Sequence, residues 1–119
     1  MALTKVRTAG IDYAGATFID TTNSGSITLD FSAHSNFVLT FTGNVTLANP
    51  TTESIGQSGV IICIQDGTGG RTLTLGTDYE TASGAVVTLS SSASAVDIVP
   101  YYVKASNSIM LGKIQRAFS

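Results

Sequence analysis

The 119-residue sequence contains no tryptophan, one cysteine, one histidine and two prolines. A single cysteine excludes a disulfide within the chain, so the fold must be held by its core and its hydrogen bonds. Charged residues make up only 12% of the sequence, about half the usual share. The net charge of −2 argues against a nucleic-acid partner, because such binding needs a basic surface.

Long apolar runs are also missing. No stretch approaches the roughly 20 residues needed to span a bilayer, so no membrane partner is expected. The first five residues, 1–5, are followed by polar sequence and not by the apolar run of a secretory signal. We therefore expect the chain to be made in a cytoplasm. Cys63 lies in the apolar run 59–64, where it is interpreted as a small core residue.

The sequence offers no recognisable catalytic or metal-binding set. His34 is the only histidine and lies in a predicted loop, whereas a nucleophilic triad needs a histidine beside an activated serine or cysteine. Zinc needs three or four ligands, which one cysteine and one histidine cannot supply. Gly67–Arg71 is followed by a predicted strand, not by the helix of a phosphate-binding loop. We predict a protein that is not an enzyme and has no cofactor, metal or small-molecule substrate.

What the sequence does contain is typical of β-structure. It has 17 threonines, 14 serines and 12 glycines, residues that suit pleated surfaces and turns. Apolar residues alternate with polar ones at a period of two, and no apolar stripe has helical spacing. The alternating segments predict about seven to nine short strands, arranged as an antiparallel, jelly-roll-like β-sandwich. They are Ile27/Leu29/Phe31, Phe37/Leu39/Phe41, Leu73/Leu75 and Val87/Leu89.

Three further segments are predicted as strands. Residues 60–64 are apolar throughout, which favours a central strand covered on both faces. Residues 96–103 contain Pro100, which predicts an edge or a bulge at that position. A last strand is expected from Ile109 to Ile114 or further, after a hairpin connection at 104–108. Thr42-Gly43-Asn44 is predicted to join two short strands.

A glycine-rich turn is predicted between 60–65 and 71–75. Its glycines allow positive φ and a tight reversal, and Asp66 can accept hydrogen bonds from its own turn. Gln65 and Arg71 flank the turn and could hydrogen-bond across the hairpin or to another subunit. The turn motif consists of Gln65, Asp66, Gly67, Gly69, Gly70 and Arg71.

The chain is predicted to divide into an N-terminal arm, 1–22, and a β-sandwich domain, 23–119. Residues 1–11 and 98–119 carry five basic residues and no acid, and all eight acids lie in 12–97. This asymmetry is either chance in a charge-poor chain or a sign that basic ends dock on an acidic neighbour. The arm is the predicted protein interface, through Leu3, Lys5, Val6, Arg7 and Ile11.

Two segments resemble a β-rich module of virion proteins from tailed bacteriophages. They are Phe41–Leu47 and Gln65–Thr74, the second with the string Gln-Asp-Gly-Thr-Gly-Gly-Arg-Thr. Gly56-Gln57-Ser58-Gly59 and the start Ala2-Leu3-Thr4-Lys5-Val6 fit the same pattern. The resemblance implies a jelly-roll-like sandwich, often trimeric, without catalytic residues.

From this resemblance we expect a structural protein of the virion. The first hypothesis is a capsid decoration, or cement, protein on the capsid surface, with the major capsid protein and copies of itself as partners, arranged as a homotrimer. The alternatives are a tail or head-fibre component and a module that binds a host glycan.

Overall fold

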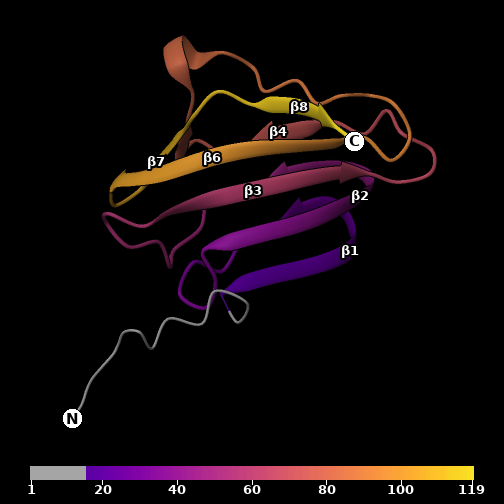
Figure 1. The fold of residues 1–119 in the computed structure, drawn as a ribbon. Coiled ribbons are helices and arrows are strands. Elements are labelled where there is room, and N and C mark those ends of the chain that lie inside the picture. The colour runs from indigo at the N-terminus through magenta and orange to yellow at the C-terminus, as the bar shows by residue number, and fades with distance from the viewer. Residues whose placement is uncertain (1–15) are drawn as a thin grey trace.

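The structure is a computed structural model that describes residues 16–119. This part of the chain forms eight strands and a single 3-10 turn (Figure 1). The all-β fold class and the expected number of strands are thereby confirmed. The elements are β1 (Thr17–Ile27), β2 (Asn36–Leu47), β3 (Ser58–Gln65), β4 (Leu73–Leu75), β5 (Tyr79–Glu80), η1 (Ala82–Gly84), β6 (Val96–Ala105), β7 (Ser108–Leu111) and β8 (Gln115–Phe118).

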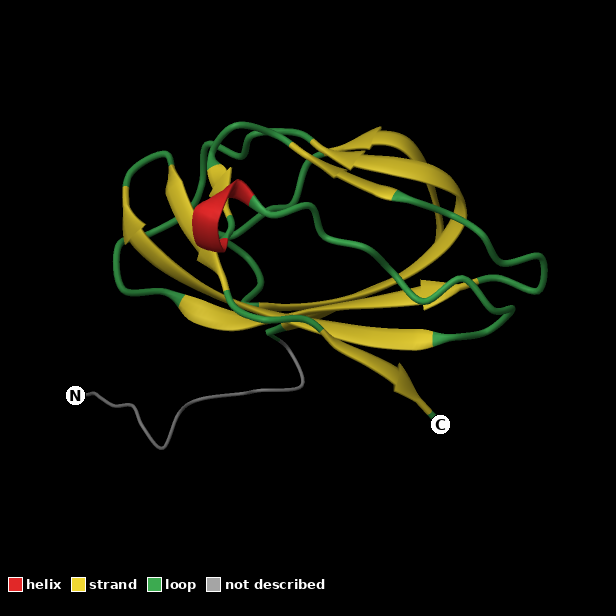
Figure 2. Cartoon of the chain, turned by 90° about the horizontal axis from the view of Figure 1, so that it is seen from above, coloured by secondary structure: helices red, strands yellow, loops and turns green. Residues whose placement is uncertain are grey.

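The strands form one curled sheet in the order β1-β2-β3-β6-β7-β5, with β4 added beside β2 and β8 beside β6. Seen from above, the sheet curls so that one part of it faces another across the interior, as in a sandwich (Figure 2). β1 already includes residues 17–22, which were predicted to belong to the arm.

The antiparallel part of the prediction holds for only some of the pairs. β3 with β6, β6 with β7, and β6 with β8 are antiparallel. β1 with β2, β2 with β3, β2 with β4, and β5 with β7 are parallel. The chain therefore coils through its first passes in one direction before β6 reverses it. Alternation of side chains specifies which face is buried but not the direction of the neighbouring strand, so the sequence pattern could not distinguish these arrangements.

Thr42-Gly43-Asn44 was predicted to be a turn that joins two short strands. It is instead a bend within the continuous strand β2. Before the bend β2 pairs with β3, and after it with β4. Opposite the bend, β1 shifts its register on both sides of Asn23, whose amide donates to the carbonyls of Asp20 (2.9 Å) and Thr40 (3.1 Å). Gly43 allows the close approach, because a Cβ there would lie 2.8 Å from Cβ of Ser24.

The strand predicted through Ile27, Leu29 and Phe31 ends at Ile27. Leu29 and Phe31 are nevertheless buried. The backbone of this loop has no neighbouring strand to pair with, and side chains form hydrogen bonds with it instead. The backbone N–H of Phe31 donates to Oγ1 of Thr52 (2.9 Å), and its carbonyl accepts from Nε2 of Gln57 (2.9 Å). The Phe31 ring packs edge to face on Phe37 and on Tyr101.

β3 is central, as predicted, because it lies between β2 and β6. It is not covered on both faces, however. Ile61 and Cys63 are 1% and 2% exposed, whereas Val60, Ile62 and Ile64 are only half-buried. The apolar run therefore reflects one face in the core and a second apolar face that looks outward.

On the side of β6 that does not pair with β3, the neighbouring strand changes at Pro100. On that side β6 pairs with β8 up to Ile98 and with β7 from Tyr101 onward, so Pro100, which has no N–H to donate, occupies the gap between the two. Its carbonyl accepts from the N–H of Gly112 (2.8 Å). The expected last strand is likewise divided into β7 and β8, and the hairpin before it is confirmed, with Asn107 in the left-handed region at φ 61°.

Candidate protein-interaction surface

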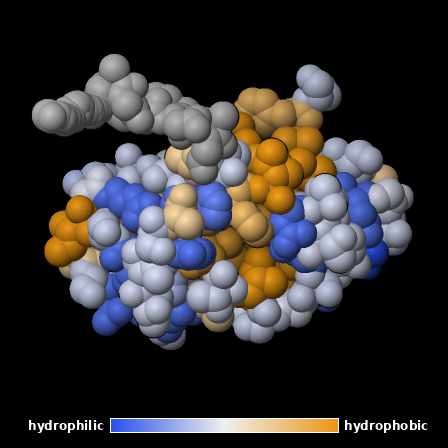
Figure 3. Space-filling view, turned by 90° about the horizontal axis from the view of Figure 1, so that it is seen from below, coloured by the Kyte–Doolittle hydropathy of each residue, from blue (hydrophilic) through white to orange (hydrophobic). Residues whose placement is uncertain are grey.

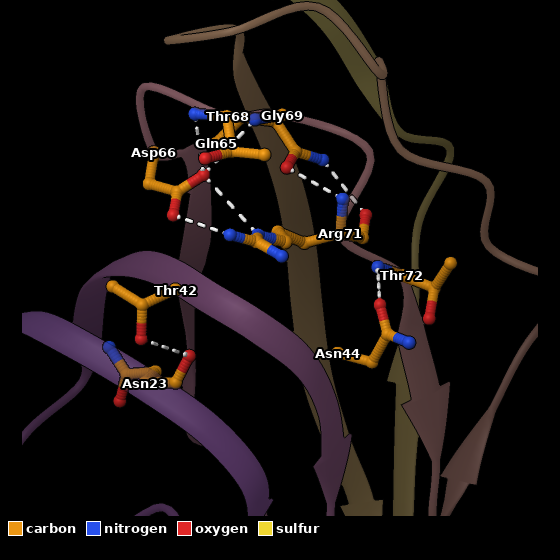
Figure 4. Close-up of polar contacts among 9 residues, drawn as sticks. All are labelled: Asn23, Thr42, Asn44, Gln65, Asp66, Thr68, Gly69, Arg71 and Thr72. Carbon is orange, nitrogen blue, oxygen red and sulfur yellow. Dashed lines mark hydrogen bonds and ion pairs between the residues drawn. The ribbon is translucent and has the colours of Figure 1, made fainter.

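The turn motif is held together by its own side chains (Figure 4). Oδ1 of Asp66 accepts the backbone N–H groups of Thr68 and Gly69, both at 3.1 Å. Its Oδ2 pairs with Nη2 of Arg71 at 2.9 Å, and Oδ1 also accepts from Nε of Arg71 at 3.3 Å. Gly69 has φ +77°, and a Cβ there would lie 2.5 Å from the carbonyl oxygen of Ser91, so glycine is required on two counts.

Gln65 anchors the same turn from inside. Its side chain is 3% exposed, and its amide makes three hydrogen bonds. Nε2 donates to the carbonyls of Arg71 (2.8 Å) and Ser90 (2.9 Å), and Oε1 accepts the N–H of Arg71 (2.9 Å). The motif thus ties the end of β3 to the entry of β4 and to the loop before β6. A hairpin was predicted here, and that prediction is wrong. β3 and β4 each pair with β2 and not with each other.

The Asp66 carboxylate has a pH signature that can be measured. Hydrogen bonds from Arg71 first, and from the N–H groups of Gly69 and Thr68, lower the pKa of Asp66 from 3.8 to about 2. A carboxylate with a lowered pKa in the fold stabilises the protein above its unfolded pKa, and this contribution is lost as the pH falls through the folded value. We expect the urea midpoint to fall between about pH 4 and pH 2, and to fall less in the Asp66→Asn variant.

Arg71→Met is the partner variant for this test. It removes the largest cause of the lowered pKa while keeping Asp66, so its urea midpoint should also depend less on pH than that of the wild type. If the profiles of the wild type and Asp66→Asn ran parallel from pH 5 to pH 2, the turn would not titrate as argued.

Two organising residues were not singled out from the sequence. Gln57 was noted only as part of the family pattern. Its Nε2 donates to the carbonyls of Phe31 and His34, and its Oε1 accepts the N–H of Ser54 (3.2 Å). Asp97 is 1% exposed, and its two carboxylate oxygens accept the N–H groups of Ser90 (2.6 Å) and Ala117 (2.9 Å). Only the fold brings these loops together, so neither role had a local signal.

The side chains that could be reactive, Cys63 and His34, are packed against other residues of the core or of a loop. Burial, with a smaller effect from Asp97, raises the pKa of the Cys63 thiol to about 12, which keeps it protonated and unreactive. The His34 ring packs against Phe18 and Phe37. Among residues 16–119, no three His, Cys, Asp or Glu side chains gather as metal ligands, and no helix is long and apolar enough to cross a membrane.

A surface hollow of about 500 Å³ lies beside β4 and β5. Threonines contribute to its lining, namely Thr74, Thr77 and Thr81. The aromatic residue in the lining, Tyr79, is only 6% exposed. The hollow therefore presents hydroxyl groups without the exposed aromatic face on which a sugar stacks.

The surface with the greatest potential for protein contact is the outward face of the sheet, which we call the outer apolar face. Strand register places Ile19, Val38, Ile62 and Ile98 in one row across β1, β2, β3 and β6. Ile64, Val96 and Phe118 form a second row, and Tyr102 and Met110 a third. Figure 3 views the molecule from the β1 side and shows hydrophobic side chains gathered mainly in one zone between hydrophilic regions, with a smaller patch at the left edge.

Four of these side chains are unusually open for their type, and the remaining ones are half-buried. Ile19 is 67% exposed, and Tyr102, Phe118 and Met110 are each close to half exposed. The predicted interface residues Leu3, Lys5, Val6, Arg7 and Ile11 lie outside the described residues, so that prediction stays a prediction. The sequence reasoning missed the outer apolar face because it interpreted the uniform run of β3 as buried on both sides.

Comparison with known proteins assigns the fold to a family. Residues 21–104 match the family model described as "Putative phage tail fibre C-terminal domain", a stretch that runs from within β1 to near the end of β6. No curated protein and no solved structure matches the chain. The match confirms the resemblance noted in the sequence, and this chain accordingly belongs to that phage tail fibre family and is a structural protein of the phage virion.

Proposed function

We propose that this protein is a component of the phage tail fibre, and that it acts by binding other protein subunits without catalysing a reaction. The observation that carries the proposal is the family match, which runs from within β1 to near the end of β6 and so includes most of the core. It supports a place in the tail over the capsid surface that was the first hypothesis from the sequence.

The interior supports a purely structural role. Two of its polar side chains hold loops together: Gln65 and Asp97 are buried and bind backbone groups of segments distant in sequence. The Cys63 thiol is buried between strands, and the raised pKa of this group keeps it neutral. Among residues 16–119, the outer apolar face is the exposed feature that best suits the burial of protein surface.

Gold-labelled antibody microscopy of intact virions tests this placement. Antibodies against the purified chain should label the tail and leave the head facets free. Label on the facets would overturn the proposal in favour of a capsid decoration protein bound to the major capsid protein. A virion preparation lacking the protein is the control for antibody specificity.

A further inference from the structure

The outer apolar face is continuous across the centre of the sheet. Neighbouring strands lie about 4.8 Å apart, so side chains that share a register row touch along the row. The row Ile19, Val38, Ile62 and Ile98 crosses four adjacent strands. Beside it, Ile64 and Val96 are directly paired, and so are Val60 and Pro100. An apolar surface of this extent on a soluble domain marks a contact site.

Charge is missing from the three central strands of the same surface. The outward residues of β2 and β3 are Asn36, Val38 and Thr40, and Ser58, Val60, Ile62 and Ile64. Those of β6 up to Tyr102 are Val96, Ile98, Pro100 and Tyr102, and the first charged residue beyond them is Lys104, which pairs with Glu80 at 3.3 Å. A charged or strongly polar partner would lose hydration here without gaining a partner group. The face is instead complementary to a surface as apolar as itself.

From these observations we infer that the outer apolar face binds the same face of a second copy of this chain. Interfaces between identical subunits are more apolar than other protein contacts, and symmetry lets one patch serve both partners. Sheets also pack face to face, at about 10 Å. Five adjacent strands at about 4.8 Å spacing and about 23 Å length give roughly 550 Å² before side-chain relief, which is of the order of the roughly 800 Å² per partner in stable interfaces.

The test measures the mass of the full chain in solution. Sedimentation velocity between about 1 and 100 µM should give a multiple of the 12.3 kDa chain mass. Ile62→Asp, which places a charge in the centre of the face, should shift the protein to the single-chain mass or weaken association at least about tenfold. The cause is that a carboxylate hydrated in the free chain would be buried without a partner in the complex.

Two further variants keep this test decisive. Met110→Asp changes a residue that is already 45% exposed on the same face, so this variant should fold and should associate less than the wild type. It keeps the test valid even if the circular dichroism spectrum of Ile62→Asp shows that this variant does not fold. Val86→Asp is the matched control, because Val86 is 84% exposed on the loop after η1 and lies off the face. It should keep the wild-type mass.

A wild-type chain that sediments as a single copy throughout would overturn the inference. So would variants of the face that keep the wild-type mass, since the contact would then lie elsewhere. The inference rests on the proposed structural role, but its test uses the purified chain. Failure to self-associate therefore leaves the antibody result unaffected, and label on the facets would leave the contact between copies unaffected.

Discussion

Gly59→Ala is expected to destabilise the protein by about 3 kcal/mol or more, the upper end of the range for overpacked sites. A Cβ at residue 59 would lie 1.9 Å from the carbonyl oxygen of Ser35. That carbonyl cannot move freely, because it accepts a hydrogen bond from the hydroxyl of Tyr101 at 2.7 Å. In addition, the N–H of Ser35 donates to the carbonyl of Ala16 at 2.9 Å. The added methyl group must therefore separate the start of β3 from the loop before β2.

Urea unfolding followed by circular dichroism measures the effect, and Gly67→Ala is the matched control. Gly67 lies in the turn motif with no heavy atom within 4 Å of an added Cβ and without a positive φ. It should unfold within about 0.5 kcal/mol of the wild type, as substitutions away from special sites do. A Gly59→Ala variant as stable as this control would contradict the packing described for the β2 and β3 entries.

Asp97→Ala is expected to cost about 2–5 kcal/mol, because it removes a buried acceptor and with it two hydrogen bonds from part-buried N–H groups. These groups belong to Ser90, in the loop before β6, and to Ala117, in β8. The variant should also release the C-terminal strand, so hydrogen exchange should accelerate in β8 more than in β2.

Asp30→Ala is the control for a carboxylate with the same number of bonds. Asp30 accepts both the N–H (3.0 Å) and the hydroxyl (2.6 Å) of Ser32, but it is exposed, so water can replace it. Its loss should leave the urea midpoint close to that of the wild type. Equal losses in the two variants would mean that the burial of Asp97 is not what makes its hydrogen bonds important.

The limits of the sequence are clearest in β2. Alternation at Phe37, Leu39 and Phe41 was enough to predict an extended strand with that face in the core, and all three are buried. The glycine at 43 was interpreted as a turn because glycine most often serves there. In the fold, its missing side chain lets β1 approach, a contact between segments that no local pattern encodes.

The candidate site divides in the same way. The turn motif was located from its glycines, and the role of Asp66 within its own turn was predicted from local chemistry, since its partners lie within five residues. Gln65 binds Ser90, and Asp97 binds Ala117, at separations that only the folded sheet closes. Buried polar residues of this kind look like ordinary surface residues in a sequence.

The sequence by itself determined the all-β class, the number of strands, the buried face of most of them and the family, because period-two alternation and glycine placement are local properties. Tertiary structure alone decided the parallel coil of the first strands and the assignment of the second apolar face of β3 to the outside. The physical reason is that a strand's pattern records which side chains avoid water, but not whether a neighbouring strand, a second layer or another subunit covers them.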